Sequence, residues 1–292
     1  MARQWEAELV VDRSLAAALV REQFGLAAAT VELVAAGWDY TVHRVDGVWA
    51  FRFPRRAQVL EPLRRELEVL PQLAPLLPVG VPEPVHAGVP SEAFPWPFYG
   101  SAWLPGREAT LAAGRDALAP QLGRLLRTIH DADVPGLPVD VMRRADMRLR
   151  VPRLRDELAA CEEEGIWSPP AAVSPLLELA ERLPPPVTAT VCHGDLHVRQ
   201  LLVDGSRLTG LVDWVDVCRS DPGLDLQIAF AFLEPDTRPA FFDAYGPVAE
   251  ASLVRARIVA LFLSAALARY GRAEANAAVE REAVASLGRA LR

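Results

Sequence analysis

Lysine is absent from this chain of 292 residues, so all 31 basic residues counted as lysine plus arginine are arginines. Any chemical step that uses an ammonium group must therefore be carried out by another side chain. Cysteine is scarce as well: Cys161, Cys192 and Cys218 form no C-x-x-C pair and leave an odd thiol. Neither a disulfide framework nor a zinc ribbon is indicated, and we expect reduced thiols.

Long apolar runs and an excess of positive charge are also missing. No apolar run approaches the ~20 residues needed to cross a bilayer, and the opening Met-Ala-Arg-Gln-Trp-Glu lacks the basic-then-apolar order of a secretory signal. We therefore expect a soluble cytoplasmic protein without a membrane partner. The formal net charge of −7 argues against nucleic-acid binding, which depends on clustered cations. It suits a cationic substrate, although it also simply favours solubility.

The first third of the chain predicts a small antiparallel sheet. A helical pattern ends near Gly25, and strand-like residues follow at 31–34, 41–45 and 48–53, with an Asp-Gly turn between the last two. Glu61-Pro62 opens a helix. Proline and glycine crowd residues 71–105, which predicts loops around short strands at 84–87 and 98–104.

The rest of the chain is predominantly helical in pattern. Helix-forming residues at helical spacing begin at Leu111, and residues 249–292 are almost all helix formers. The strand-rich and helical parts meet near residues 101–106. The composition and length thus predict an α+β protein with room for two lobes.

One strand-rich island interrupts the helical part. Two apolar strand-like runs, 200–203 and 208–212, flank a turn at Asp204-Gly205, so that Asp195 precedes one strand and Asp213 follows the other. A hairpin would bring these two carboxylates together.

Phosphoryl transfer is the chemistry that this arrangement favours. It needs an aimed hydroxyl, a metal on the phosphates and cations against developing charge. Asp195 can accept the proton of the attacking hydroxyl, and the side-chain oxygens of Gln200 and Asp213 can ligate Mg²⁺. Neither G-x-G-x-x-G nor G-x-x-x-x-G-K-[ST] occurs, so Gly37 is expected to be a turn or phosphate-loop glycine.

Several motifs together carry a resemblance to a known family. The island contains His193-Gly194-Asp195-Leu196-His197, Gly210-Leu211-Val212-Asp213-Trp214 and Asp221-Pro222-Gly223-Leu224-Asp225-Leu226. Upstream stand Gly37-Trp38-Asp39, Phe51-Arg52-Phe53, Arg65-Glu66, Trp103-Leu104-Pro105-Gly106 and Thr128-Ile129-His130. In this order and spacing the chain resembles the aminoglycoside and macrolide phosphotransferases over most of its length.

The resemblance implies a bilobal protein-kinase-like fold with a sheet-containing N-lobe at 1–100, a hinge at 101–106 and a helical C-lobe at 107–292. It implies ATP or GTP as phosphoryl donor, Mg²⁺ as cofactor and a small-molecule hydroxyl as acceptor, possible acceptors including antibiotics. The implied roles are a base at Asp195, metal ligands at Gln200 and Asp213, a phosphate-binding Arg52 paired with Glu66, and a purine-binding backbone around Ser101 and Trp103.

Two positions depart from the family pattern. Asn, or sometimes His, is usual where Gln200 stands, and the amide oxygen of glutamine lies one methylene further out. Lysine is usual in kinases where Arg52 stands, and a guanidinium is a planar fork rather than a point charge. These departures motivate an alternative, a nucleotide-binding pseudokinase that acts as a regulatory module.

Other interpretations of the same residues remain open at the level of sequence. His193 and His197 are four residues apart, as in helical zinc sites, although Gly194 discourages a helix there. Asp221 and Asp225 are expected to cap or brace a helix start, and Asp216 has no assigned role. The aromatic residues Phe94, Trp96 and Phe98 are expected to pack in a core.

Overall fold

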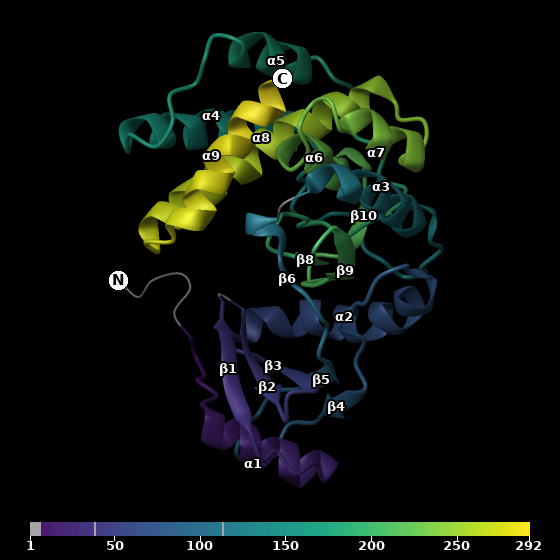
Figure 1. Ribbon diagram of the computed structural model, residues 1–292, viewed down its shortest axis with the longest axis vertical. Coiled ribbons are helices and arrows are strands. Elements are labelled where there is room, and N and C mark those ends of the chain that lie inside the picture. The colour runs from purple at the N-terminus through teal and green to yellow at the C-terminus, as the bar shows by residue number, and fades with distance from the viewer. Residues whose placement is uncertain (1–6, 38, 113) are drawn as a thin grey trace. The chain divides into compact units, whose positions relative to one another are not determined.

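The computed structural model describes residues 7–37, 39–112 and 114–292 (Figure 1). Trp38 and the opening residues 1–6, on which the expectation about a signal rested, lie outside the described residues. The chain divides into two compact units. One comprises the residues up to Pro75 together with Gly80–Leu104, and the other comprises Leu76–Val79 and Pro105–Arg292.

The first unit is built on a five-stranded antiparallel sheet of order β1-β2-β3-β5-β4. The strands are β1 Val31–Ala36, β2 Tyr40–Val45, β3 Trp49–Pro54, β4 His86–Gly88 and β5 Phe98–Ala102. The predicted hairpin is confirmed: Asp46 and Gly47 both have positive φ, as a tight two-residue turn between twisted strands requires. Arg52 of β3 lies opposite Tyr99 of β5.

Helix α1, Arg13–Phe24, packs against this sheet (Figure 1). Asp12 caps its start, and Gly25 ends it in the left-handed conformation, as predicted. Its apolar face joins a core of phenylalanines from β3, β5 and the preceding loop: Phe51, Phe53, Phe94 and Phe98. The expected packing role of Phe94 and Phe98 is confirmed, and Trp96 packs against the same core.

Helix α2, Leu60–Leu73, continues past the point where the sequence predicted a loop. Pro71 lies inside its last turn, and a 3₁₀ turn, Ala74–Leu76, follows. Proline removes only one helical hydrogen bond. Burial of Leu70 and Leu73, both at 0% exposure, outweighs that loss, so the prediction of a loop from Pro71 was wrong.

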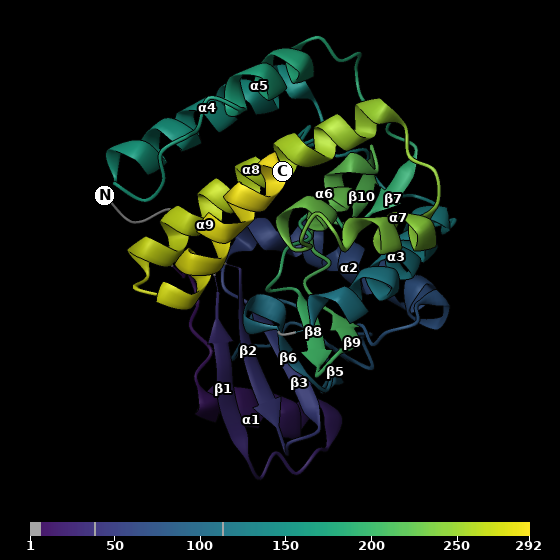
Figure 2. The same cartoon turned by 45° about the horizontal axis from the view of Figure 1, so that its top comes forward.

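The second unit is mostly helical. Its helices are α3 Arg115–Asp131, α4 Met147–Glu163, α5 Val173–Glu181, α6 Gly223–Ala231, α7 Arg238–Tyr245, α8 Glu250–Ala273 and α9 Ala277–Leu291. Helix α8 packs against α4, α6 and α9 (Figure 2). Among the described residues α8 alone is long and apolar enough to cross a membrane, but 61% of its apolar window is buried inside the protein, as in a core helix.

Two small sheets interrupt these helices. Strands β8, Leu201–Asp204, and β9, Arg207–Leu211, form the predicted hairpin, and β6, Arg107–Glu108, extends it. Strand β7, Thr190–Cys192, pairs instead with β10, Cys218–Ser220. The predicted fold class, an N-terminal antiparallel sheet followed by a mostly helical part, is confirmed.

Candidate active site

The loop between β7 and β8 is held in place by one buried carboxylate from α6. Asp225, at 0% exposure, accepts hydrogen bonds from the backbone N–H groups of His193 at 2.7 Å and Gly194 at 3.0 Å. Its Oδ2 also lies 3.2 Å from Nε2 of His130, whose Nδ1 meets the Tyr245 hydroxyl at 2.7 Å. Asp225 therefore braces the segment that carries Asp195, rather than merely a helix start.

Burial alone would raise the pKa of Asp225, but the hydrogen bond and charge of His130, with further contributions from His193 and Gly194, lower it below the usual value. The carboxylate is thus ionised at neutral pH. A charged acceptor holds backbone N–H donors more strongly than a neutral one. The loop is therefore anchored by charge-assisted hydrogen bonds to the Asp225 carboxylate.

Gly194 is required by the close approach of a second loop. Its φ is +96°, and a Cβ atom there would lie 2.2 Å from the carbonyl oxygen of Asp216. Both the backbone angle and the space exclude an ordinary side chain. The loop of Asp195 and the loop that follows β9 therefore pass directly over one another.

His193 is a structural residue in this arrangement. Its ring packs 4.8 Å from that of Trp214, and its Nε2 donates to the carbonyl of Val212 at 3.0 Å. Burial lowers its pKa, so the ring is neutral. Among the described residues, the group whose ligand atoms converge as for a metal is His130, Cys192 and Asp225, and neither His193 nor His197 belongs to it. The zinc interpretation of the two histidines thus gains no support.

Asp195 lies among several acidic groups. Loss of hydration, followed by the charges of Asp216, Asp213 and Asp225, raises its pKa to about 8, while Arg144 opposes the rise. Its side chain is nevertheless 37% exposed. A carboxyl that is partly open and has a raised pKa is the kind of group that can accept a proton from a substrate.

Arg144 ties the two loops to the start of α4, and the sequence did not single it out. Its guanidinium lies 3.1 Å from a carboxylate oxygen of Asp140 and 3.1 Å from one of Asp216. Only 8% of Arg144 is exposed. The ion pair gives Asp216 a structural partner. The sequence signal for Arg144, two adjacent arginines between helices, is too common to be specific.

Gln200 and Asp213 lie at the two ends of the hairpin, beside the Asp195 loop. Asp213 follows β9 with a φ of +69°. The amide oxygen of Gln200 accepts from the N–H of His197 at 3.2 Å, and its amide nitrogen lies 2.9 Å from Nε2 of that ring. These oxygens are of the hard kind that magnesium prefers, and the neighbouring carboxylates of Asp216 and Asp213 raise the pKa of Asp195, an effect that a bound cation would oppose. Gln200 would have to give up its contact with His197 to take part.

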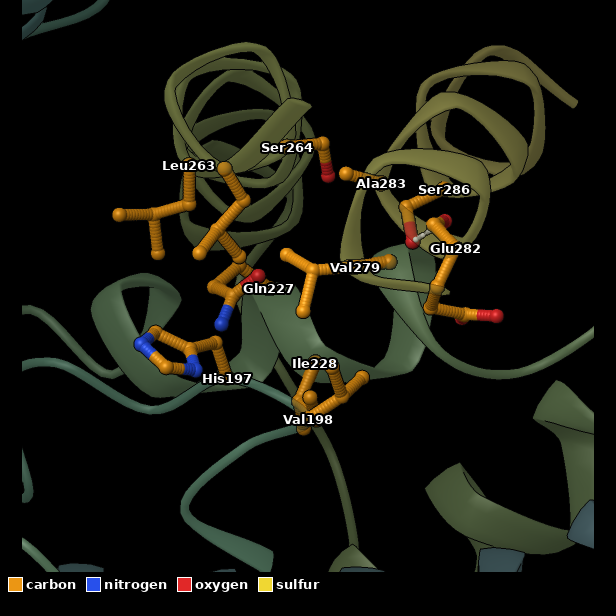
Figure 3. Close-up of a pocket in the computed structure, with 12 residues that line it drawn as sticks. His197, Val198, Gln227, Ile228, Leu263, Ser264, Val279, Glu282, Ala283 and Ser286 are labelled. Atoms are coloured by element: carbon orange, nitrogen blue, oxygen red, sulfur yellow. Dashed lines mark hydrogen bonds between the residues drawn. The ribbon is translucent and has the colours of Figure 1, made fainter. Parts of the chain in front are cut away.

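A cavity adjoins this loop (Figure 3). It is small, with about 20 Å³ open to the centre of a water molecule, and it lies between His197 and helices α6, α8 and α9. Its lining is largely apolar, with Ile228, Leu263 and Val279 facing it in Figure 3. Its carboxylate, Glu282, is paired with Arg115 at 2.7 Å.

The cavity leaves little polar capacity for a ligand. The amide of Gln227 donates to the Leu196 carbonyl, and the hydroxyl of Ser286 donates to the Glu282 carbonyl at 2.9 Å. Burial, with the nearby Arg199, lowers the pKa of His197 to about 3, so its imidazole is neutral. The space beside the loop therefore favours an apolar group over a cation.

In the first unit, the predicted ion pair between Arg52 and Glu66 is present. Nη1 of Arg52 lies 2.6 Å from Oε1 of Glu66, and the Tyr99 hydroxyl donates to the same oxygen at 3.0 Å. The guanidinium also stacks over the Tyr40 ring at 4.3 Å. Glu66 is fully buried, so its carboxylate and the rings of Tyr40 and Tyr99 help to fix this arginine in position.

The end of β5 determines which backbone groups face away from the sheet. The N–H of Trp103 donates to the Val48 carbonyl at 2.8 Å, and Ala50 lies opposite Ser101. In an antiparallel ladder these are hydrogen-bonded pairs, so the intervening Ala102 directs its N–H and C=O outward. Ser101 is 1% exposed. The outward donor and acceptor therefore belong to Ala102, which lies within the predicted purine-binding segment around Ser101 to Trp103.

The chain was compared with known families and structures. The model of the phosphotransferase enzyme family (APH) matches residues 30–258. No curated protein matches. The fold resembles that of aminoglycoside 2′-phosphotransferase-IIIa in its GDP complex, with a TM-score of 0.72 and 20% identity over 96% of this chain and 99% of that one.

Two further structures show the same fold. The apoenzyme of macrolide 2′-phosphotransferase MphH from Brachybacterium faecium has a TM-score of 0.59 and 23% identity over 93% of this chain and 97% of that one. The streptomycin-ATP-APH(2″)-IIa ternary complex has a TM-score of 0.60 and 14% identity over 96% of this chain and 99% of that one. The family match spans well over half of the sequence. This chain belongs to the phosphotransferase enzyme family and is a small-molecule kinase with a protein-kinase-like fold.

Proposed function

We propose that this kinase transfers the γ-phosphoryl group of ATP or GTP to a hydroxyl of a small molecule, with Asp195 as the base. The observation that carries the proposal is the braced loop. Asp225 and Gly194 fix a partly exposed carboxyl whose pKa is raised to about 8. A cytoplasmic location agrees with this role.

In the proposed reaction, the acceptor oxygen attacks the γ-phosphorus while the bond to the bridging oxygen breaks. Asp195 takes the hydroxyl proton in its ionised form. In the metal-free protein its pKa of about 8 keeps it mostly protonated at neutral pH, and the charge of a bound cation would favour the ionised form. Phosphoryl transfer asks little more of the protein than positioning and charge stabilisation. The rigid bracing of the loop supplies the positioning.

Gln200 and Asp213 are the proposed ligands of magnesium, which when bound would neutralise the phosphates and the surrounding carboxylates. Arg52, held by Glu66 at 2.6 Å, is the proposed contact to the nucleotide phosphates. The purine is proposed to meet the end of β5, where Ala102 directs its backbone groups outward between Ser101 and Trp103.

The acceptor is proposed to approach Asp195 from the cavity beside His197. Aminoglycosides and macrolides are both candidate acceptors, since the compared structures include phosphotransferases for each. The apolar lining and the paired Glu282 favour an acceptor with an apolar body. An apolar substituent of a macrolide suits this small cavity better than a cationic group of an aminoglycoside does.

A nucleotide-consumption screen with Mg²⁺ tests the proposal. Purified protein is offered ATP and GTP with aminoglycosides, macrolides, sugars and amino alcohols, and phosphorylated product is identified by mass spectrometry. We expect acceptor-dependent consumption with at least one class. Nucleotide binding without magnesium and without any turnover would instead favour the pseudokinase, which the engagement of the Gln200 amide oxygen with His197 motivates.

A further inference from the structure

Arg150, in the first turn of α4, differs from the other buried arginines. Among the described residues, seven arginines are buried: Arg52, Arg56, Arg144, Arg150, Arg238, Arg255 and Arg289. Five of them lie within 4.0 Å of a carboxylate: Arg52, Arg56, Arg144, Arg255 and Arg289. Arg238 lacks one but donates to the carbonyls of Ala229, Arg289 and Arg292.

Within the described part of the chain, Arg150 has no carboxylate partner and donates to a single carbonyl. Its Nε donates to the carbonyl of Arg144 at 3.0 Å, and its guanidinium stacks over the ring of Phe262 at 4.1 Å. No described carboxylate pairs with it, and its two terminal nitrogens donate to no described residue. Only 5% of Arg150 is exposed. The edge of the guanidinium that carries the two terminal nitrogens of this buried cation is therefore not engaged by any described residue.

Such a cation is costly unless something pairs with it. Burial, followed by the charges of Arg144 and Arg153, lowers the pKa of Arg150 to about 10, so it remains charged at neutral pH. Buried charges in proteins are normally paired. Stacking on an aromatic ring fixes the plane of the guanidinium and leaves its outer edge ready for two parallel hydrogen bonds.

The position of Arg150 points to the reaction centre. Arg150 donates to the backbone of Arg144, whose guanidinium lies 3.1 Å from Asp216 and beside Gly194, the neighbour of Asp195. Asp195 does not form an ion pair with Arg150 in the described structure, although its charge is among those that act on it. Helices α4 and α8 run side by side (Figure 2), and Leu263 and Ser264, which follow Phe262, line the cavity beside the Asp195 loop.

We propose that Arg150 binds an oxyanion in front of Asp195. The shared chemistry is a carboxylate or phosphate that accepts two hydrogen bonds from the guanidinium edge. Two sources can supply it, an anionic group on the acceptor or the phosphoryl group in transit from the nucleotide. The choice between them rests on the proposed kinase function, but the existence of the oxyanion site does not.

The test is the binding of inorganic phosphate to nucleotide-free protein and to protein with Mg²⁺ and ADP, measured by calorimetry. Arg150→Met keeps most of the apolar stem and removes the charge. We expect it to weaken phosphate binding by about tenfold or more, the size of a charge-assisted bidentate contact. Arg153→Met on the exposed side of the same helix is the matched control and should bind phosphate as the wild type does.

The nucleotide arm separates the two sources. If the oxyanion is the transferred phosphoryl group, Arg150→Met weakens the binding of ATP more than that of ADP. If it belongs to the acceptor, the ratio of the two affinities stays at the wild-type value. Because no turnover is needed, Arg150-dependent phosphate binding in a protein that consumes nucleotide with no tested acceptor would count against the proposed transfer reaction and keep the proposed oxyanion site.

Two results would overturn the proposal. One is a folded Arg150→Met protein that binds phosphate and ATP with wild-type affinity, and the other is a wild type that binds no phosphate in either state. If Arg150→Met does not fold, Arg150→Lys is the second variant, because it keeps the positive charge but lacks the planar guanidinium that makes two parallel hydrogen bonds. It should bind phosphate more weakly than the wild type, and equal affinity would contradict the assignment.

Discussion

Replacing Asp225 with Asn should separate the bracing of the loop from the chemistry of Asp195. The carboxylate accepts from His193 N–H at 2.7 Å, from Gly194 N–H at 3.0 Å and from His130 at 3.2 Å. The neutral amide of asparagine keeps one acceptor oxygen and places its NH₂ group against hydrogen-bond donors of the loop or of His130. One charge-assisted bond is lost and one buried N–H is left without an acceptor, so we expect a loss of about 2 to 4 kcal/mol in the free energy of unfolding.

The same change should reduce turnover by on the order of 100-fold, since a shift of about 1 Å in a catalytic group has this effect. Urea unfolding followed by tryptophan fluorescence gives the stability, because Trp214 is buried against His193. Steady-state kinetics on a folded sample gives kcat. The difference in stability between wild type and variant should be present above the unfolded pKa of about 4 and should shrink as pH falls through the lowered pKa of Asp225.

Asp221→Asn is the matched control. Asp221 is also buried and lies 3.4 Å from Arg255, but it does not touch the Asp195 loop through its side chain. The Asp221→Asn variant should have a lower free energy of unfolding than the wild type, while its folded form keeps the wild-type kcat. Equal kcat in Asp225→Asn and wild type, or unchanged stability, would refute the idea that Asp225 positions the loop.

Three further variants test other parts of the structure. Gly194→Ala should be destabilised and inactive, because its Cβ would lie 2.2 Å from the Asp216 carbonyl oxygen at a φ of +96°; a stable, active variant by thermal denaturation and kinetics would show that the loops do not meet as described. Glu66→Gln leaves the buried Arg52 without its charge partner and should cost about 3 kcal/mol and raise the KM for nucleotide, whereas Glu68→Gln on the exposed face of α2 should do neither. Asp146→Ala removes the N-cap residue of α4; hydrogen bonds from Arg148 and Arg143 lower the pKa of the Asp146 carboxyl to about 2. The free energy of unfolding should fall by about 1 to 2 kcal/mol above pH ~4, and this difference should vanish as pH falls through about 2. A difference that persists at lower pH would contradict this origin.

The parts that the sequence could predict depend on neighbouring residues. The turn at Asp46-Gly47 and the end of α1 at Gly25 follow from local backbone preferences and appear in the structure, and the second hairpin turns at Gly205-Ser206, one residue later than predicted. The hairpin prediction in turn placed Asp195 and Asp213 close enough for their charges to interact.

The parts that it could not predict depend on distant pairings. Strand β7 pairs with β10 across an intervening hairpin, and no local pattern specifies that partner. Arg144 contacts the site from the loop before α4, and Arg150 is proposed to do so from α4 itself. Arginine is so frequent in this lysine-free chain that neither residue stands out in the sequence. The role of Asp225 as an acceptor for two backbone N–H groups becomes visible only when the β7–β8 loop is placed against α6.

The most direct measurement is the comparison of Asp195→Asn with wild type in turnover and in thermal stability. Loss of the base should lower kcat by about 10² to 10⁴ on the acceptor that the screen identifies. Because the folded pKa of Asp195, about 8, exceeds the unfolded value, ionisation destabilises the metal-free protein as pH rises above about 4. The variant should therefore melt at a higher temperature than wild type at pH 7, with Asp204→Asn at the hairpin turn as control. Wild-type turnover by Asp195→Asn, in a folded protein, would contradict the account.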